Sequence, residues 1–155
     1  MTRVKVPRRG SRGLRLPRFG ARLGNRMLLR SFRRGGARTQ GGIPTLLLET
    51  VGAKSGQPRQ VVLGFLEEGD DAWLVVASLA GAARNPAWLH NLAAHPDATV
   101  HFEDGSRVPV HAETLAGTEL ADAWKRLERE APEYPKYLSK TDREMAIVRL
   151  RRVTS

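Results

Sequence analysis

The chain of 155 residues has no cysteine, which excludes disulfide bonds, zinc–thiolate sites, iron–sulfur clusters and cysteine nucleophiles. No apolar run approaches the roughly 20 residues of a membrane span, and the N-terminus lacks the apolar core of a signal peptide. We therefore expect a cytoplasmic protein that is soluble or peripheral.

Most sequence motifs of catalysis are also missing. The four histidines do not show the HExxH spacing of a metal site, no serine lies in GxSxG, and no GxGxxG follows an expected strand. No pair of carboxylates stands out, and no metal site is expected. If the chain is an enzyme, its chemistry is expected to come from an organic cofactor.

Acidic residues are absent from the first 38 positions, which carry 13 lysines and arginines. Residues 39–155 carry 13 basic and 16 acidic residues, so the net charge of +10 divides into +13 and −3. We therefore expect a basic arm over residues 1–38, partly disordered, and one globular domain over residues 39–155.

Arginine, proline and glycine dominate the arm up to about residue 18, a composition typical of disorder. Residues 17–34 show helical spacing, with Phe19, Leu23 and Met27 in one row. This row can cover the domain core, or the basic amphipathic helix can bind an anionic surface such as the inner face of the plasma membrane. No base-reading module follows, so no specific nucleic acid is expected as a partner.

Residues 39–155 show the pattern of a mainly β domain. Strands are expected at residues 43–51, 60–67, 72–78, 98–103, 106–115 and 145–153, the first three as an antiparallel meander. Residues 104–105 give the strongest hairpin signal. Helices are expected at residues 87–94 and 118–130, capped by Asn85 and Thr118. About six mostly antiparallel strands with two or three helices tend to close into a small barrel.

A basic loop between the first two strands brings Lys54, Ser55 and Arg59 together with the backbone N–H groups of Gly52 and Gly56. These donors suit a phosphorylated or carboxylated ligand. An ordinary hairpin loop has a similar composition, so both interpretations stay open on this stretch alone. A Walker-type loop is excluded because the glycine spacing before the lysine is missing.

Three blocks resemble the deazaflavin-dependent nitroreductase family, whose members are split β-barrel reductases that use reduced coenzyme F420, an 8-hydroxy-5-deazaflavin. The blocks are GxKSGxPR at residues 52–59, VAS…G…NPAWxxNL…P at residues 76–96, and YxxY…TDR at residues 134–143. The resemblance covers about residues 38–151. It implies a split β-barrel of the FMN-binding-like kind and hydride transfer from reduced F420 to a quinone, enone or nitro-type acceptor. It also links the basic helix to membrane association.

The resemblance also assigns cofactor-binding residues. It implies that the phosphate and oligoglutamate tail is bound by Gly52, Lys54, Ser55, Gly56 and Arg59. It implies that the deazaflavin ring lies along Val76, Ala77 and Ser78, with Trp88 and Asn91 facing the same pocket. On the residues alone, Trp88 is typical of a core residue and Asn91 of a helix cap.

Two tyrosines match those that family members place over the ring. Either Tyr134 or Tyr137 could then orient an acceptor oxygen or donate a proton, and Ser78 completes the implied catalytic set. Ala53 and Leu79 stand where other members carry basic residues, which implies weaker tail binding. A further departure, the absence of a third aromatic residue before the pair, favours quinones or enones over nitroimidazoles.

Other interpretations remain open at this point. A carrier of the same fold could bind the deazaflavin without turnover, and a related split barrel could use FMN instead. The basic arm alone would suit an adaptor for membranes or nucleic acid. A monomer and a homodimer both fit.

Overall fold

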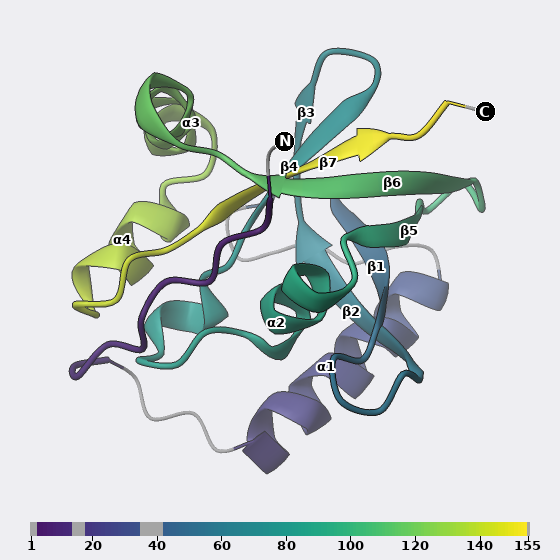
Figure 1. Cartoon of the computed structure of the whole chain (residues 1–155), viewed down its shortest axis with the longest axis horizontal. Helices are drawn as coiled ribbons and strands as arrows, with labels where there is room; N and C mark the ends of the chain where they lie inside the picture. The colour runs from purple at the N-terminus through teal and green to yellow at the C-terminus, as the bar shows by residue number, and fades with distance from the viewer. Residues whose placement is uncertain (1–2, 14–17, 35–41, 155) are drawn as a thin grey trace.

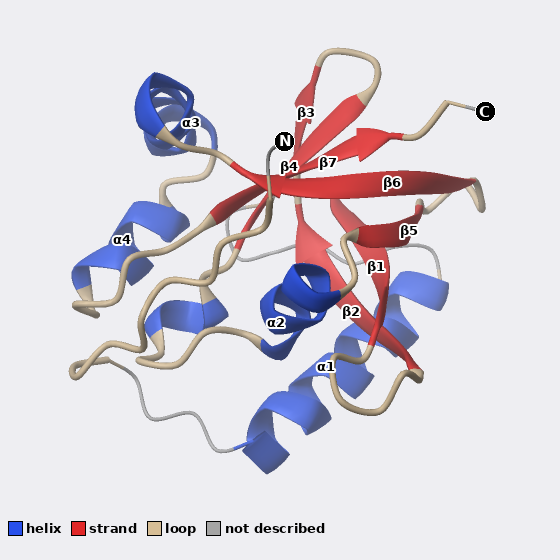
Figure 2. Cartoon of the chain, viewed as in Figure 1, coloured by secondary structure: helices blue, strands red, loops and turns tan. Residues whose placement is uncertain are grey.

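The computed structural model describes residues 3–13, 18–34 and 42–154. In these ranges one antiparallel sheet is surrounded by helices (Figures 1 and 2). The strands are β1 (Thr45–Val51), β2 (Pro58–Gly64), β3 (Leu66–Glu68), β4 (Ala72–Val76), β5 (Asp97–His101), β6 (Arg107–Thr114) and β7 (Ile147–Arg152). The helices are α1 (Arg18–Arg33), α2 (Ala87–Ala94), α3 (Gly117–Glu130), α4 (Glu133–Ser139) and the short 3-10 helix η1 (Leu79–Gly81).

The strand order explains why the sheet curls. β2 and β3 stand at opposite ends of the order β2-β1-β5-β6-β7-β4-β3, and yet only Phe65 separates them in the chain. Two edges joined through one residue must lie close together, so the sheet closes on itself as a half-barrel. The predicted split β-barrel is thus confirmed, with seven strands in the described residues instead of about six.

Both antiparallel pairings of the predicted meander are confirmed, but its middle strand is not continuous. The strand expected at residues 60–67 is divided at Phe65 into β2 and β3, which lie at opposite ends of the sheet order. β1 pairs with β2 and β5, whereas β4 pairs with β3 and β7. The chain turns at Phe65, whose N–H donates to the carbonyl of Pro44 at 3.1 Å, and then enters a second hairpin. The predicted hairpin at residues 104–105 is confirmed between β5 and β6, with Gly105 at a φ of +88°.

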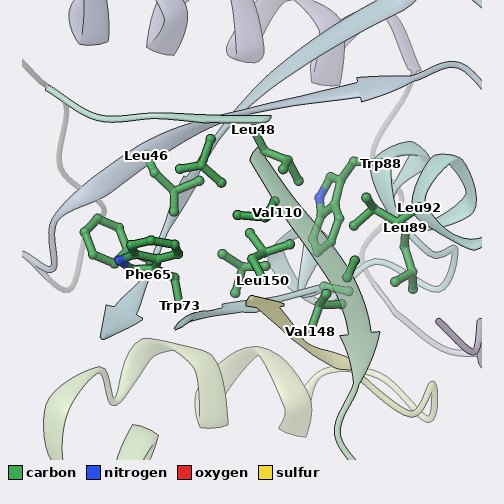
Figure 3. Close-up of a cluster of buried hydrophobic side chains, with 14 of the residues drawn as sticks. Leu46, Leu48, Phe65, Trp73, Trp88, Leu89, Leu92, Val110, Val148 and Leu150 are labelled. Carbon is green, nitrogen blue, oxygen red and sulfur yellow. The ribbon is translucent and has the colours of Figure 1, made fainter. Parts of the chain in front are cut away.

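The core lies inside the curled sheet (Figure 3). Leu46 and Leu48 of β1 point inward, while Leu47 between them is buried against α1, so this strand is covered on both faces. Helix α2 closes the sheet with Trp88 and Leu89. Fully burying one such apolar side chain contributes about 1.5–3 kcal/mol to stability.

Helix α1 confirms the helix expected at residues 17–34, but a different face touches the sheet. Phe32 is buried and Leu29 half-buried against β1 and β2, whereas Leu23 is 50% exposed and Met27 is 64% exposed. The prediction that this row covers the core is therefore wrong for Leu23 and Met27, and the side chain of Phe19 lies outside the described residues. The aromatic ring of Phe32 buries a large apolar surface, so α1 turns the face that carries Phe32 toward the sheet. No helix within the described ranges is long and apolar enough to cross a membrane.

Residues 3–13, here called the N-terminal segment, were predicted to be disordered but are ordered in the structure. This segment runs in extended form along the barrel (Figure 1), with Val4 and Val6 against the core. The N–H of Gly10 donates to the carbonyl of Ala83 at 2.8 Å. Composition missed this order because it depends on backbone hydrogen bonds and on two isolated valines, neither of which stands out in a stretch dominated by arginine, proline and glycine. The division of the chain into arm and domain stays a prediction.

Candidate cofactor site

The loop between β1 and β2 carries the cations predicted to bind an anionic tail. Lys54 and Arg59 are exposed, and among the described residues neither forms an ion pair with a carboxylate. The Nη2 of Arg59 donates to Ser55 Oγ at 3.4 Å, so these two side chains share one corner of the loop. The loop therefore presents positive charge that no carboxylate neutralises, as an anionic ligand requires.

Gly52 and Gly56 shape this loop and do not offer free amides. The N–H of Gly52 donates to the carbonyl of Gln57 at 2.8 Å, and the N–H of Gly56 donates to the carbonyl of Gly52 at 2.9 Å. The prediction that these two N–H groups bind the tail does not fit this geometry, because both are already used. Gly56 has a φ of +69°, which favours glycine, whereas a Cβ at Gly52 would displace the hydroxyl of Ser55.

Asn91 of α2 holds the loop in place. Its Oδ1 accepts a hydrogen bond from the N–H of Ala53 at 3.0 Å, and its Nδ2 donates to Thr50 Oγ1 at 3.1 Å. Asn91 and Thr50 are both buried. The side chain of Asn91 is thus neither a helix cap nor free to face a ring, and it acts by positioning the loop.

Trp88 lies in the hydrophobic core. Its side chain is 7% exposed and points in among the leucines and valines of the barrel (Figure 3). This placement favours the core interpretation of Trp88 over the ring-pocket interpretation.

The segment after β4 forms a strained turn. Val76 and Ala77 are buried, while Ser78 is half-buried and its hydroxyl has no hydrogen-bond partner in the described part of the chain. The next residue, Leu79, has a φ of +42°, a conformation that costs about 1–3 kcal/mol. A strained turn beside a free hydroxyl is typical of a functional site.

Helix α4 places the two tyrosines next to this turn. The rings of Tyr134 and Tyr137 meet edge to face with centroids 6.1 Å apart. A Cβ at Gly81 of η1 would lie 2.8 Å from the carbonyl oxygen of Tyr137, so η1 and α4 are in close contact. The structure thus brings the turn and the tyrosines together, whereas the basic loop lies on the other side of α2 in the view of Figure 1.

Burial raises the pKa of Tyr134 to about 12, and the neighbouring Tyr137 adds to this shift. Burial also raises the pKa of Tyr137, with a further contribution from the negative charge of Glu133. Both phenols therefore keep their proton well above neutral pH and can donate a hydrogen bond.

These two pKa values can be measured directly because the chain has only two tyrosines. Phenolate absorbance of the ligand-free protein should show both ionisations above the ordinary value of 10.0, with Tyr134 at about 12. Since the folded-state values exceed the unfolded ones, the stability they contribute is present below about pH 10 and is lost as the pH rises through the folded values. Tyr137→Phe should leave the single transition of Tyr134, and a transition of the folded variant below about pH 10 would contradict the burial argument.

A cavity of about 230 Å³ lies elsewhere, between β3, β4 and α3. Its lining includes Glu68, Glu119, Asp122 and Arg126. Three carboxylates would repel a polyanionic tail, so this cavity does not suit the predicted cofactor. Within the ranges that the structure describes, no group of side chains could hold a metal ion.

Two buried polar residues near the site were not predicted. Thr50 and Arg143 are each 2% exposed. Nothing in the sequence distinguishes Thr50 from other strand residues. Arg143 ends the third matched block, and that position could have marked it as a site residue.

A family model described as F420H(2)-dependent quinone reductase matches residues 21–152. The chain belongs to this family. The F420H(2)-dependent quinone reductase Rv1261c of Mycobacterium tuberculosis H37Rv is 39% identical over 120 residues, which cover 76% of this chain and 79% of the relative. A solved F420-H2 dependent reductase, FDR-A, is 35% identical with a TM-score of 0.62, over 69% of this chain and 93% of that one. A structure titled as a domain-swapped dimer is 31% identical with a TM-score of 0.63, and the match covers 84% of this chain and 98% of that one.

Membership in the F420H(2)-dependent quinone reductase family confirms the resemblance seen in the three blocks and the oxidoreductase class. The residues present fit coenzyme F420. Lys54 and Arg59, which form no ion pair within the described residues, suit the phosphate and carboxylates of the tail. The hydroxyl of Ser78 and the two protonated phenols suit a flat redox ring and its acceptor.

Proposed function

We propose that this chain transfers a hydride from reduced coenzyme F420 to a quinone-type acceptor. The observation that carries the proposal is that the candidate site combines two chemically different ends. At one end Lys54 and Arg59 offer positive charge that no carboxylate of the described residues pairs with. At the other end Ser78, Tyr134 and Tyr137 offer hydroxyl groups. A ligand with a polyanionic tail and a flat ring needs both.

When bound, the cofactor supplies the hydride, and the residues of the chain bind and orient the reactants. Lys54, Ser55 and Arg59 hold the tail. A quinone that receives a hydride takes up one proton to become a hydroquinone. A protonated phenol of Tyr134 or Tyr137 can supply this proton to the acceptor oxygen and regain one from water.

The test is a titration of the full chain with coenzyme F420 and FMN side by side, followed by oxidation of reduced F420 with menadione. We expect binding of F420 alone and menadione-dependent oxidation, with an enone and a nitro compound compared as acceptors. Binding of F420 without oxidation of any acceptor would favour a carrier, and preferential binding of FMN would favour a flavin reductase. Either result would overturn the proposal.

Contact between residues 1–38 and an anionic membrane surface is also a proposal. It is supported by the exposed Leu23, Met27 and Leu28 of α1, beside the exposed Arg26 and Arg30. The full chain should cosediment with vesicles that contain anionic lipid. Leu23→Glu combined with Met27→Glu should abolish this, and unchanged cosedimentation of that variant would contradict the proposal.

A homodimer is the assembly that the comparisons favour. A 31% identical structure is titled as a domain-swapped dimer, in which identical elements are exchanged between protomers. Light scattering of the full chain would distinguish a monomer from a dimer.

A further inference from the structure

Arg143 is a buried side chain that ties together the loop from β4 to α2. Its Nε donates to the carbonyl of Ala82 at 2.9 Å, and its Nη2 donates to the carbonyl of Ser78 at 2.8 Å. Its Nη1 donates to the carbonyl of Ala77 and to Asn85 Oδ1, each at 3.0 Å. One planar group therefore fixes three carbonyls and one amide oxygen of this loop.

The charge of Arg143 is unusual for a buried position. Within the described residues no carboxylate forms an ion pair with it, whereas the other buried arginine, Arg149, pairs with Glu68, Glu113 and Glu119. Burial lowers the pKa of the Arg143 guanidinium, but an arginine stays protonated in proteins. A buried charge without a counter-ion is costly, so its four hydrogen bonds to neutral oxygens must all be formed.

These hydrogen bonds hold the strained part of the site. The carbonyls of Ala77 and Ser78 directly precede Leu79, which has the positive φ of +42°. The carbonyl of Ser78 also accepts the N–H of Gly81 at 2.9 Å, so the turn is closed on itself. Without the guanidinium the backbone at Leu79 could relax, and the hydroxyl of Ser78 would move with it.

The N-terminal segment covers Arg143 from outside. Asp142 accepts the N–H of Arg12 at 2.7 Å and also the hydroxyl of Ser11, and Thr141 Oγ1 donates to the carbonyl of Arg12 at 2.6 Å. A Cβ at Gly10 would lie only 2.9 Å from the Cβ of Arg143.

The same segment also holds Asn85. The Nδ2 of Asn85 donates to the carbonyl of Pro7 at 2.7 Å, and α2 has Pro86 as its N-cap without a side-chain hydrogen bond. The predicted capping role of Asn85 is therefore wrong, and its side chain links the N-terminal segment to Arg143.

We propose that Arg143 is a positioning residue for the ring end of the cofactor site, where it holds residues 77–82 in the turn that presents Ser78. This inference rests on the proposed function, because the turn matters only if a ring binds there. It gives a role to the TDR block that the hydride-transfer chemistry leaves unexplained.

The test compares coenzyme F420 with its tail-less ring and ribityl fragment as ligands of the full chain. Arg143→Lys keeps the charge but loses the planar fork, and we expect at least about 10-fold weaker binding of the fragment. Arg149→Lys is the matched control, since it replaces a buried arginine away from the turn. It should lower the melting temperature and leave fragment affinity unchanged.

A second readout separates positioning from general stability. Adding Leu79→Gly to Arg143→Lys should restore part of the fragment affinity, because glycine adopts a positive φ without strain. If Arg143→Lys does not fold, Asn85→Ala removes one acceptor and should weaken the fragment about 3- to 10-fold. Fragment affinity unchanged in Arg143→Lys, or lowered equally in Arg149→Lys, would overturn the inference.

Amide hydrogen exchange of the ligand-free protein decides the structural part independently. Exchange at residues 77–82 should accelerate in Arg143→Lys and not in Arg149→Lys, and equal protection in the two variants would overturn the inference. A parent chain that binds neither F420 nor the fragment would contradict the proposed function, while this exchange experiment would still show whether Arg143 holds the turn.

Discussion

Replacing Lys54 and Arg59 together by alanine is expected to weaken the binding of coenzyme F420 at least about 100-fold. A charge-assisted hydrogen bond to an anionic tail contributes about 1.5–3 kcal/mol, and the exposed position of both side chains brings them to the lower end of that range. Titrations of the parent and the variant, followed by the fluorescence of the ligand, measure the change. Affinity of the parent should also fall as salt is raised, because exposed charges are screened.

The matched control for this prediction is Lys125→Ala with Arg129→Ala. These two residues are exposed on α3 and change the net charge by the same amount away from the loop. Their replacement should leave the affinity for F420 unchanged. Equal losses in both double variants would mean that the overall charge attracts the ligand and that the loop does not contact it.

Replacing Tyr134 and Tyr137 together by phenylalanine is expected to lower kcat with menadione about 100-fold or more, the usual contribution of a general acid. The affinity for F420 should stay nearly the same, since both rings and their edge-to-face contact are kept. The fall in kcat is expected because both phenols are protonated at neutral pH and can donate a proton to the acceptor oxygen. Steady-state kinetics and a binding titration on the same preparation separate the two effects.

The single variants show which phenol acts. Tyr134 is buried and Tyr137 is half-buried, so Tyr137 is the one more open to an acceptor from solvent. Tyr137→Phe should therefore lower kcat more than Tyr134→Phe. If the double variant turned over menadione like the parent, the proton would come directly from water and the assigned role of both residues would be wrong.

The sequence predicted the local elements and the pairing of neighbouring strands well, and the order of the whole sheet poorly. Apolar runs located β4 and β7, and the Asp-Gly turn located the hairpin at residues 104–105, because each of these signals lies within a few residues. The pairings of β1 with β5, of β4 with β7 and of β6 with β7 were not predicted, because they depend on the single bend at Phe65, which sends the chain to the far end of the sheet order. Helix caps were missed as well: α3 begins after Ala116, not at the predicted Thr118.

The site shows the same division. The cations of the loop and the two tyrosines could be picked out from the matched blocks, because that signal lies in chemical type and position in the chain, and their roles stay predictions. The sequence does not show which backbone N–H groups already form hydrogen bonds within the loop. Gly52 and Gly56 were therefore expected to be free donors. Apart from its place at the end of the third matched block, Arg143 looks like the many other arginines of the chain, and its burial becomes visible only in the loop that folds around it.

The N-terminal segment has a consequence for the order in which the molecule is completed. It is synthesised before the parts that it contacts: the N–H of Arg12 donates to a carboxylate 130 residues further along, and the N–H of Gly10 donates to the carbonyl of Ala83. Contacts between such distant parts of a chain form late and slowly, and domains fold as they emerge from the ribosome. The N-terminal segment must therefore wait until residues 141–143 have left the ribosome before it can dock and cover Arg143.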